Sequence, residues 1–171
     1  MAELLNEAPD MKLSKLTLAV LVTIIALAAG CNGNITQPMQ SEGTLSANFP
    51  DGTEFLAQSG VTFSLSGSNY VVTATDDDAQ GVNFNDEIAL TVPQEATLPY
   101  TVSTPIDPGE VDYWDNETHV QYYSNQTVGQ CTITITQTSP TLIGTFQAVT
   151  VSSTPPDTVV LRSGSFNANP Q

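Results

Sequence analysis

The feature that most constrains this chain is a two-residue alternation of apolar and polar side chains, which runs almost without interruption from residue 43 onward. Alternate residues of a β-strand point to opposite faces, so this period indicates strands with one buried face. The alternating segments are rich in threonine, valine, isoleucine and aromatic residues, which strands favour. They cover residues 44–49, 61–66, 69–75, 87–92, 119–123, 131–136, 142–149 and 158–166. No segment beyond residue 43 shows the stripe of an amphipathic helix.

Turn-forming sequences separate these segments. They are Pro50-Asp51-Gly52, Gly67-Ser68-Asn69, Asp107-Pro108-Gly109 and Pro155-Pro156-Asp157. Gly164 interrupts the alternation of the last segment, which is typical of a β-bulge. We therefore predict a single all-β domain over residues 44–171. Eight to eleven short antiparallel strands would form a β-sandwich or, alternatively, a β-barrel.

The residues before this domain have a different character. Lys12 and Lys15 flank the start of an uncharged, mostly apolar run that ends at Gly30, which is the pattern of a secretory signal peptide. The run is shorter than the roughly twenty residues that a membrane-spanning helix needs. The start is Met1 or Met11, and we favour Met11 because the preceding stretch is acidic where a signal peptide is basic. The predicted segments are thus a mis-called upstream extension (1–10), a lipoprotein signal peptide (11–30) and a flexible tether (31–43).

The apolar run ends in "LAAGC", which resembles the bacterial lipobox, in which a cysteine after small residues is acylated and becomes the mature N-terminus. The resemblance implies lipidation, such as palmitoylation, of Cys31 and attachment to membrane lipid. By resemblance to lipoprotein sorting signals, Asn32 implies the outer membrane, and the absence of an acidic run after it implies the periplasmic face. The alternative is an ordinary signal peptide cleaved near Ala28 or Ala29, which leaves a free thiol.

The charge balance after Cys31 excludes one class of partner. Fifteen acidic residues follow this cysteine, against a single basic residue, Arg162. Such a surface repels nucleic acid, so the partners that we expect besides lipid are a glycan or another envelope protein. The only other cysteine, Cys131, shares a strand face with Ile133 and Ile135, which predicts a buried thiol. The sequence does not specify an oligomeric state.

Two sequence frames carry a resemblance to a known group of proteins. "GTLSA" with "DGTEF" lies near the start of the domain, and "CTITITQ" with "IGTFQA" and "DTVVLRSGSFNA" lies near its end. Together they resemble uncharacterised β-domain lipoproteins of the Bacteroidota lineage. The resemblance implies the β fold and the lipid anchor, and it supplies no catalytic residues. "DTV" also resembles a short O-glycosylation motif of that lineage, which implies Thr158 as a possible acceptor.

The segment from Asp112 to Tyr123 is the densest candidate for a ligand-binding site. Aromatic rings beside carboxylates suit a sugar, because rings stack on apolar sugar faces and carboxylates accept hydrogen bonds from hydroxyls. The candidate binding residues are Tyr113, Trp114, Asp115 and Tyr123. Paired carboxylates could also hydrolyse a glycoside, with Asp112, Asp115 and Glu117 as candidates. The alternative is structural, with Trp114 covering the edge of the sandwich.

We expect no cofactor, and calcium is the alternative that the sequence leaves open. Residues 76–87 approach the calcium-loop pattern, with Asp76, Asp78 and Glu87 at ligand positions. The flanking segments have the period of strands, however, whereas this pattern belongs between helices. No nucleophile elbow, zinc-protease motif or phosphate loop is present, and His119 is the only histidine. We therefore expect a non-enzymatic, membrane-anchored lipoprotein with a structural or ligand-binding role. The alternative is a secreted carbohydrate-binding or carbohydrate-active protein.

The lipid anchor is directly testable. Cys31→Ser removes the acylated side chain, so we expect the variant to leave the membrane fraction and to partition into the aqueous phase of a detergent extraction. Cys131→Ser is the matched control and should stay with the membrane. An unmodified N-terminus at or near Cys31, found by mass spectrometry of the natural protein, would contradict lipidation.

Overall fold

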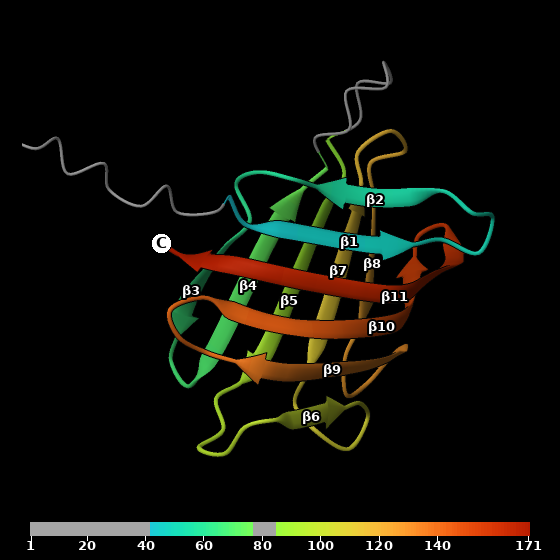
Figure 1. The fold of residues 1–171 in the computed structure, drawn as a ribbon. Helices are drawn as coiled ribbons and strands as arrows, with labels where there is room; N and C mark the ends of the chain where they lie inside the picture. The colour runs from blue at the N-terminus through green and yellow to red at the C-terminus, as the bar shows by residue number, and fades with distance from the viewer. Residues whose placement is uncertain (1–41, 77–84) are drawn as a thin grey trace, which may run out of the picture. The chain divides into compact units, whose positions relative to one another are not determined.

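The computed structural model describes residues 42–76 and 85–171, and these residues form eleven β-strands and no helix (Figure 1). The strands are β1 (Thr44–Asn48), β2 (Glu54–Ala57), β3 (Thr62–Ser66), β4 (Asn69–Thr75), β5 (Glu87–Pro93), β6 (Tyr100–Ser103), β7 (Glu110–Asp115), β8 (Val120–Ser124), β9 (Gln130–Gln137), β10 (Leu142–Ser153) and β11 (Pro156–Pro170). The predicted all-β fold is therefore confirmed. The eight alternating segments all correspond to strands, and the four turn sequences lie at strand connections. In the described part of the chain, no helix is long and apolar enough to span a membrane.

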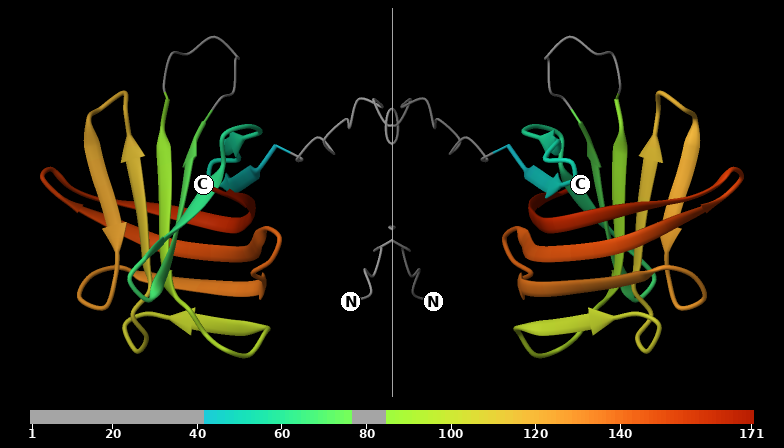
Figure 2. Two further views of the ribbon diagram at one scale, coloured as in Figure 1. Left: turned by 90° about the vertical axis from the view of Figure 1, so that its left-hand side faces the viewer. Right: turned by 90° about the vertical axis from the view of Figure 1, so that its right-hand side faces the viewer.

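The strands form two layers that cross each other steeply (Figures 1 and 2). One layer contains β3, β4, β5, β7 and β8, and the other has the order β2-β1-β11-β10-β9-β6. Hydrogen-bonded pairs also join the layers, because β11 pairs with β3 and β10 pairs with β8. The β11–β3 pairing is parallel, and all other described pairings are antiparallel. The arrangement therefore combines features of the predicted sandwich and of the alternative barrel.

The core lies between the layers and follows directly from the alternation. In β9, for example, Cys131, Ile133 and Ile135 are buried, whereas the intervening threonines are partly exposed. The prediction of a buried thiol at Cys131 is confirmed, since only 3% of this residue is exposed. Each fully buried aliphatic or aromatic side chain contributes about 1.5–3 kcal/mol to folding. The largest fully buried residues are Phe55, Leu45, Ile88, Leu90, Ile133, Ile135, Leu142 and Leu161.

A bulge bends β11 where it passes between β1 and β10. Phe146 lies opposite Gly164, but Ala148, two residues on, lies opposite Leu161, so β11 has one extra residue here. Ser163 adopts a φ of 50° within the bulge. A Cβ atom on Gly164 would lie 2.5 Å from Cε1 of Phe146, because the phenyl ring packs directly on the glycine backbone. The predicted bulge is confirmed, and Gly164 is required by this close approach.

Gly164→Ala tests that requirement. The added methyl group must displace the Phe146 ring, so we expect the free energy of unfolding to fall by about 2 kcal/mol. In a Phe146→Leu background the same change should cost less than half as much, because the clashing ring is gone. Urea denaturation of the four proteins of this double-mutant cycle measures both values. An equal cost in both backgrounds would show that the ring contact is not the reason for glycine.

Candidate functional site

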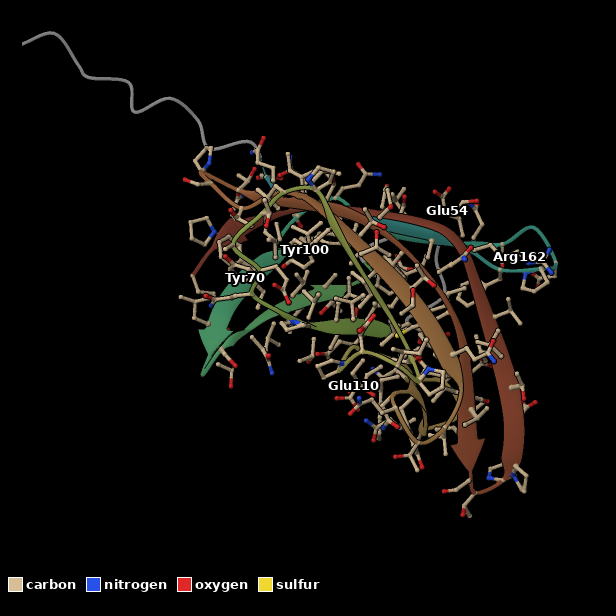
Figure 3. The ribbon with its side chains drawn as sticks, turned by 90° about the horizontal axis from the view of Figure 1, so that it is seen from below. Glu54, Tyr70, Tyr100, Glu110 and Arg162 are labelled. Carbon is tan, nitrogen blue, oxygen red and sulfur yellow. The ribbon has the colours of Figure 1, made fainter. Side chains whose placement is uncertain are left out.

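A cavity of about 680 Å³ lies at the end of the two crossed layers where β1 turns into β2. The ends of β4, β5 and β7 and the first part of β11 complete its lining. Glu54, at the start of β2, marks this side in Figure 3, and Tyr70 and Tyr100 lie on the opposite side of that view. The lining residues are Phe49, Pro50, Asp51, Thr53, Glu54, Asp76, Asp86, Tyr113, Asp115, Glu117, Thr158, Val159 and Val160.

One wall of the cavity is aromatic. The ring centroids of Phe49 and Tyr113 are 5.6 Å apart, and the Tyr122 ring lies 5.9 Å behind that of Tyr113. Strand alternation causes this arrangement, since Val111 and Tyr113 face the core and Asp115 follows on the same face, where it reaches the cavity. The cavity therefore offers an apolar surface as well as polar groups.

A hydrogen-bond network fixes one carboxylate in this cavity. The Tyr113 hydroxyl donates to Oδ2 of Asp86 at 2.6 Å, and the backbone N–H of Asn116 donates to Oδ1 of Asp86 at 2.9 Å. Burial and the neighbouring Asp86 carboxylate raise the pKa of Tyr113 far above its ordinary value, so the phenol stays protonated and continues to donate. Asp86 is thus held in place, with its charge close to the aromatic wall.

The rest of the lining is strongly acidic. Within the described part of the chain, no lysine, arginine or histidine contributes to it, and six carboxylates do: those of Asp51, Glu54, Asp76, Asp86, Asp115 and Glu117. Some of these carboxylates are held by the chain: Asp51 accepts hydrogen bonds from the backbone and hydroxyl of Thr53, which lower its pKa, and Asp115 accepts one from the backbone of Thr118. Glu54 and Glu117 have no hydrogen-bond or ion-pair partner within the described residues. Their charges are therefore free to meet a ligand.

The structure describes only two of the three residues predicted to bind calcium. Asp76 lines the cavity, whereas Glu87 is exposed on the opposite face of the β4–β5 hairpin, next to Trp114 on β7. Asp78 lies outside the described residues. Within residues 42–76 and 85–171, no three His, Cys, Asp or Glu side chains are close enough to hold a metal ion. The structure thus does not bring Asp76 and Glu87 together, and calcium binding stays a prediction.

The aromatic segment from Asp112 to Tyr123 is divided between two faces. Tyr113 and Asp115 reach the cavity, whereas Trp114, which is 38% exposed, and Tyr123 point outward from β7 and β8. The four predicted binding residues therefore do not form one surface. Thr158, the predicted glycosylation acceptor, is exposed at the cavity margin.

The outward face carries a carboxylate with an unusual ionisation. Asp112 lies between Ala89 of β5 and Tyr123 of β8. Burial, with a smaller contribution from Glu110 on the same strand face, raises the pKa of Asp112 to about 6. At neutral pH this carboxyl is still ionised, but its ionisation costs more free energy in the folded state than in the unfolded chain.

Sequence reasoning missed most of the cavity, because its residues come from four separate parts of the chain. Phe49, Glu54 and Asp86 were not among the candidate site residues, although Asp86 lies within the calcium-loop pattern of residues 76–87 and all three contribute to the lining. A signal was present nonetheless: Asp51, Asp76, Asp86, Asp115 and Glu117 all lie at strand ends or in the adjoining turns. Once the topology shows that these strand ends lie close together, their acidic residues predict an acidic cavity.

Fold and cavity together define an all-β domain with an acidic cavity at one end of two crossed strand layers. Residues 51–170 match the family described as "Domain of unknown function (DUF6252)", and the chain belongs to this family. The match includes every strand except β1. No curated protein and no solved structure matches the chain.

The raised pKa of Asp112 predicts how stability varies with pH. A carboxyl whose pKa is higher in the folded state destabilises the protein at pH values above that pKa, and the cost disappears as the group is protonated. Asp112→Asn should therefore raise the melting temperature near pH 7, and this gain should shrink between about pH 6 and pH 4.

Asp51→Asn is the control of opposite sign. The pKa of Asp51 is lowered by its hydrogen bonds to Thr53, so its ionised form favours folding and the variant should gain no stability near pH 7. Thermal denaturation at several pH values measures both variants. A stability gain for Asp112→Asn that does not change with pH would contradict the assignment.

Proposed function

We propose that this protein is a lipid-anchored, non-enzymatic binding module of the bacterial cell envelope, which holds a small ligand in the cavity beside Phe49 and Tyr113. The lipobox-like sequence supports attachment through acylated Cys31 to the outer membrane, with the domain on the periplasmic face. The cavity is the observation that supports ligand binding. Its volume of about 680 Å³ lies in the range of small-molecule sites, and its lining combines an apolar wall with convergent polar groups.

The hydrogen bonds of the carboxylates favour binding over hydrolysis. Glycoside hydrolysis needs two carboxyl groups that flank one bond. Asp112 points away from the cavity, so only Asp115 and Glu117 of the three candidates line it. Asp86 and Asp115 already accept hydrogen bonds from the chain. Carboxylates held in this way are better suited to accept hydrogen bonds from a ligand than to act as a catalytic pair that exchanges protons with a substrate.

A second candidate is glycan binding on the outward face of β7 and β8. The exposure of Trp114 supports it, because a ring that is 38% exposed can stack on a sugar. Tyr123 and the partly buried Asp112 lie on the same face. This surface is separate from the cavity, so one experiment can distinguish the two sites.

Thr158→Trp provides that experiment, since the large side chain would occupy the exposed margin of the cavity. We expect compounds from a panel of amines, sugars and sugar acids that raise the melting temperature of the natural protein to lose their effect on this variant. Thr145→Trp, at an exposed position on β10 outside the cavity, is the matched control and should keep the response.

Two results would contradict the cavity proposal. If no compound of any charge class stabilises the natural protein, the cavity is not a binding site for these chemistries. If stabilisation persists in Thr158→Trp, and the same compound changes the fluorescence of Trp114 in the natural protein, where it is the only tryptophan, the outward face is the binding surface instead.

A further inference from the structure

We propose that the ligand of the cavity is an organic cation, namely a primary amine or quaternary ammonium compound with a short apolar body. This inference rests on the proposed function, since it specifies the chemistry of the ligand that the cavity holds. Three properties of the cavity support it: its charge, its aromatic wall and the two glutamates that have no partner within residues 42–76 and 85–171.

Charge is the first argument. Among the described residues, the lining carries six carboxylates and no basic side chain, and beside the apolar wall water screens these charges less well than it does in bulk. Arg162, the single lysine or arginine after Cys31, does not line the cavity; it borders a separate polar depression beside β9 and β10. The cavity field therefore attracts cations and repels anions such as phosphates and sugar acids.

The aromatic wall favours an organic cation over a metal ion. Phe49 and Tyr113 both line the cavity, with Phe49 the more exposed of the two, and ring faces attract ammonium groups that lie within about 6 Å. Pro50, Val159 and Val160 add apolar contacts that a hydrated metal ion cannot use. In the described residues no group of three potential ligands is close enough to bind a metal. The walls thus fit a cation that carries methylene or methyl groups.

The carboxylates divide into fixed and available groups. Asp86 is held by Tyr113 and by the backbone of Asn116, so its position is set before a ligand arrives. Glu54 and Glu117 are exposed and have no partner within the described part of the chain, so they can turn toward an ammonium group without breaking a bond. A fixed acceptor with two movable charges gives charge-assisted hydrogen bonds at low cost.

Titration calorimetry with putrescine, 1,4-butanediol and magnesium chloride tests the proposal on the full chain. Putrescine has two ammonium groups on a four-carbon body, and butanediol has the same body without charge. We expect putrescine to bind the natural protein and butanediol to give no heat. Magnesium should not compete with putrescine beyond the effect of equal ionic strength.

Matched double variants locate the binding. Glu54→Gln with Glu117→Gln removes the two available charges and should weaken putrescine binding about tenfold. Glu42→Gln with Glu95→Gln removes the same charge from exposed positions outside the cavity and should leave the dissociation constant within about twofold. Phe49→Leu, which keeps an apolar side chain but loses the ring face, should weaken binding of tetramethylammonium more than that of putrescine.

The outcomes separate this inference from the proposed function. If both double variants weaken putrescine equally, or if magnesium displaces it, the acidic surface as a whole binds cations and the inference is wrong. If butanediol binds as well as putrescine and Thr158→Trp abolishes both, the cavity is a binding site but its ligand is not selected by charge. If neither binds while other compounds of the panel still depend on Thr158, only the assignment of an organic cation fails.

Discussion

The pairing between β10 and β11 is the interaction on which the rest of this structure depends. The two strands are paired at eleven positions and belong to one layer, yet each also reaches the other layer: β10 pairs with β8 and β11 pairs with β3. Every other strand is hydrogen-bonded to β10 or β11 directly or through strands that lie between. Because both layers meet on the same two strands, their crossing and the width of the core between them are set together.

The cavity is a consequence of that geometry. Beyond the bulge at Gly164, the first half of β11 leaves β1 and carries Thr158, Val159 and Val160 toward the ends of β4, β5 and β7. Asp157 accepts a hydrogen bond from the Tyr122 hydroxyl at 3.3 Å, which connects the start of the hairpin to β8. The layers therefore diverge at this end but remain joined behind the opening, which leaves space for a ligand beside Phe49 and Tyr113.

Local physics explains which parts could be predicted from sequence. The strands, the turns, the bulge and the buried Cys131 depend on period two and on backbone preferences, which are encoded by neighbouring residues. The short strands β2 and β6 were missed because four residues carry too little periodicity, and β7 was interpreted as a binding segment because its aromatic residues are unusual. The division of Tyr113 from Trp114 follows from alternation and was predictable. The cavity was not predictable from the sequence. It depends on how the two layers cross, which the β10–β11 hairpin determines, and no local sequence pattern encodes that crossing.

The position of β1 has a mechanical consequence. The chain reaches this strand at Gly43, and the cavity begins at Phe49, just past its other end. Between these points β1 is hydrogen-bonded to β2 on one side and to β11 on the other. A pulling force applied between Gly43 and the cavity residues of other strands, such as Tyr113 and Val160, would run along β1 and load these hydrogen bonds in shear. Bonds loaded in this way share the force and yield together, whereas a strand peeled from its end loses them one at a time.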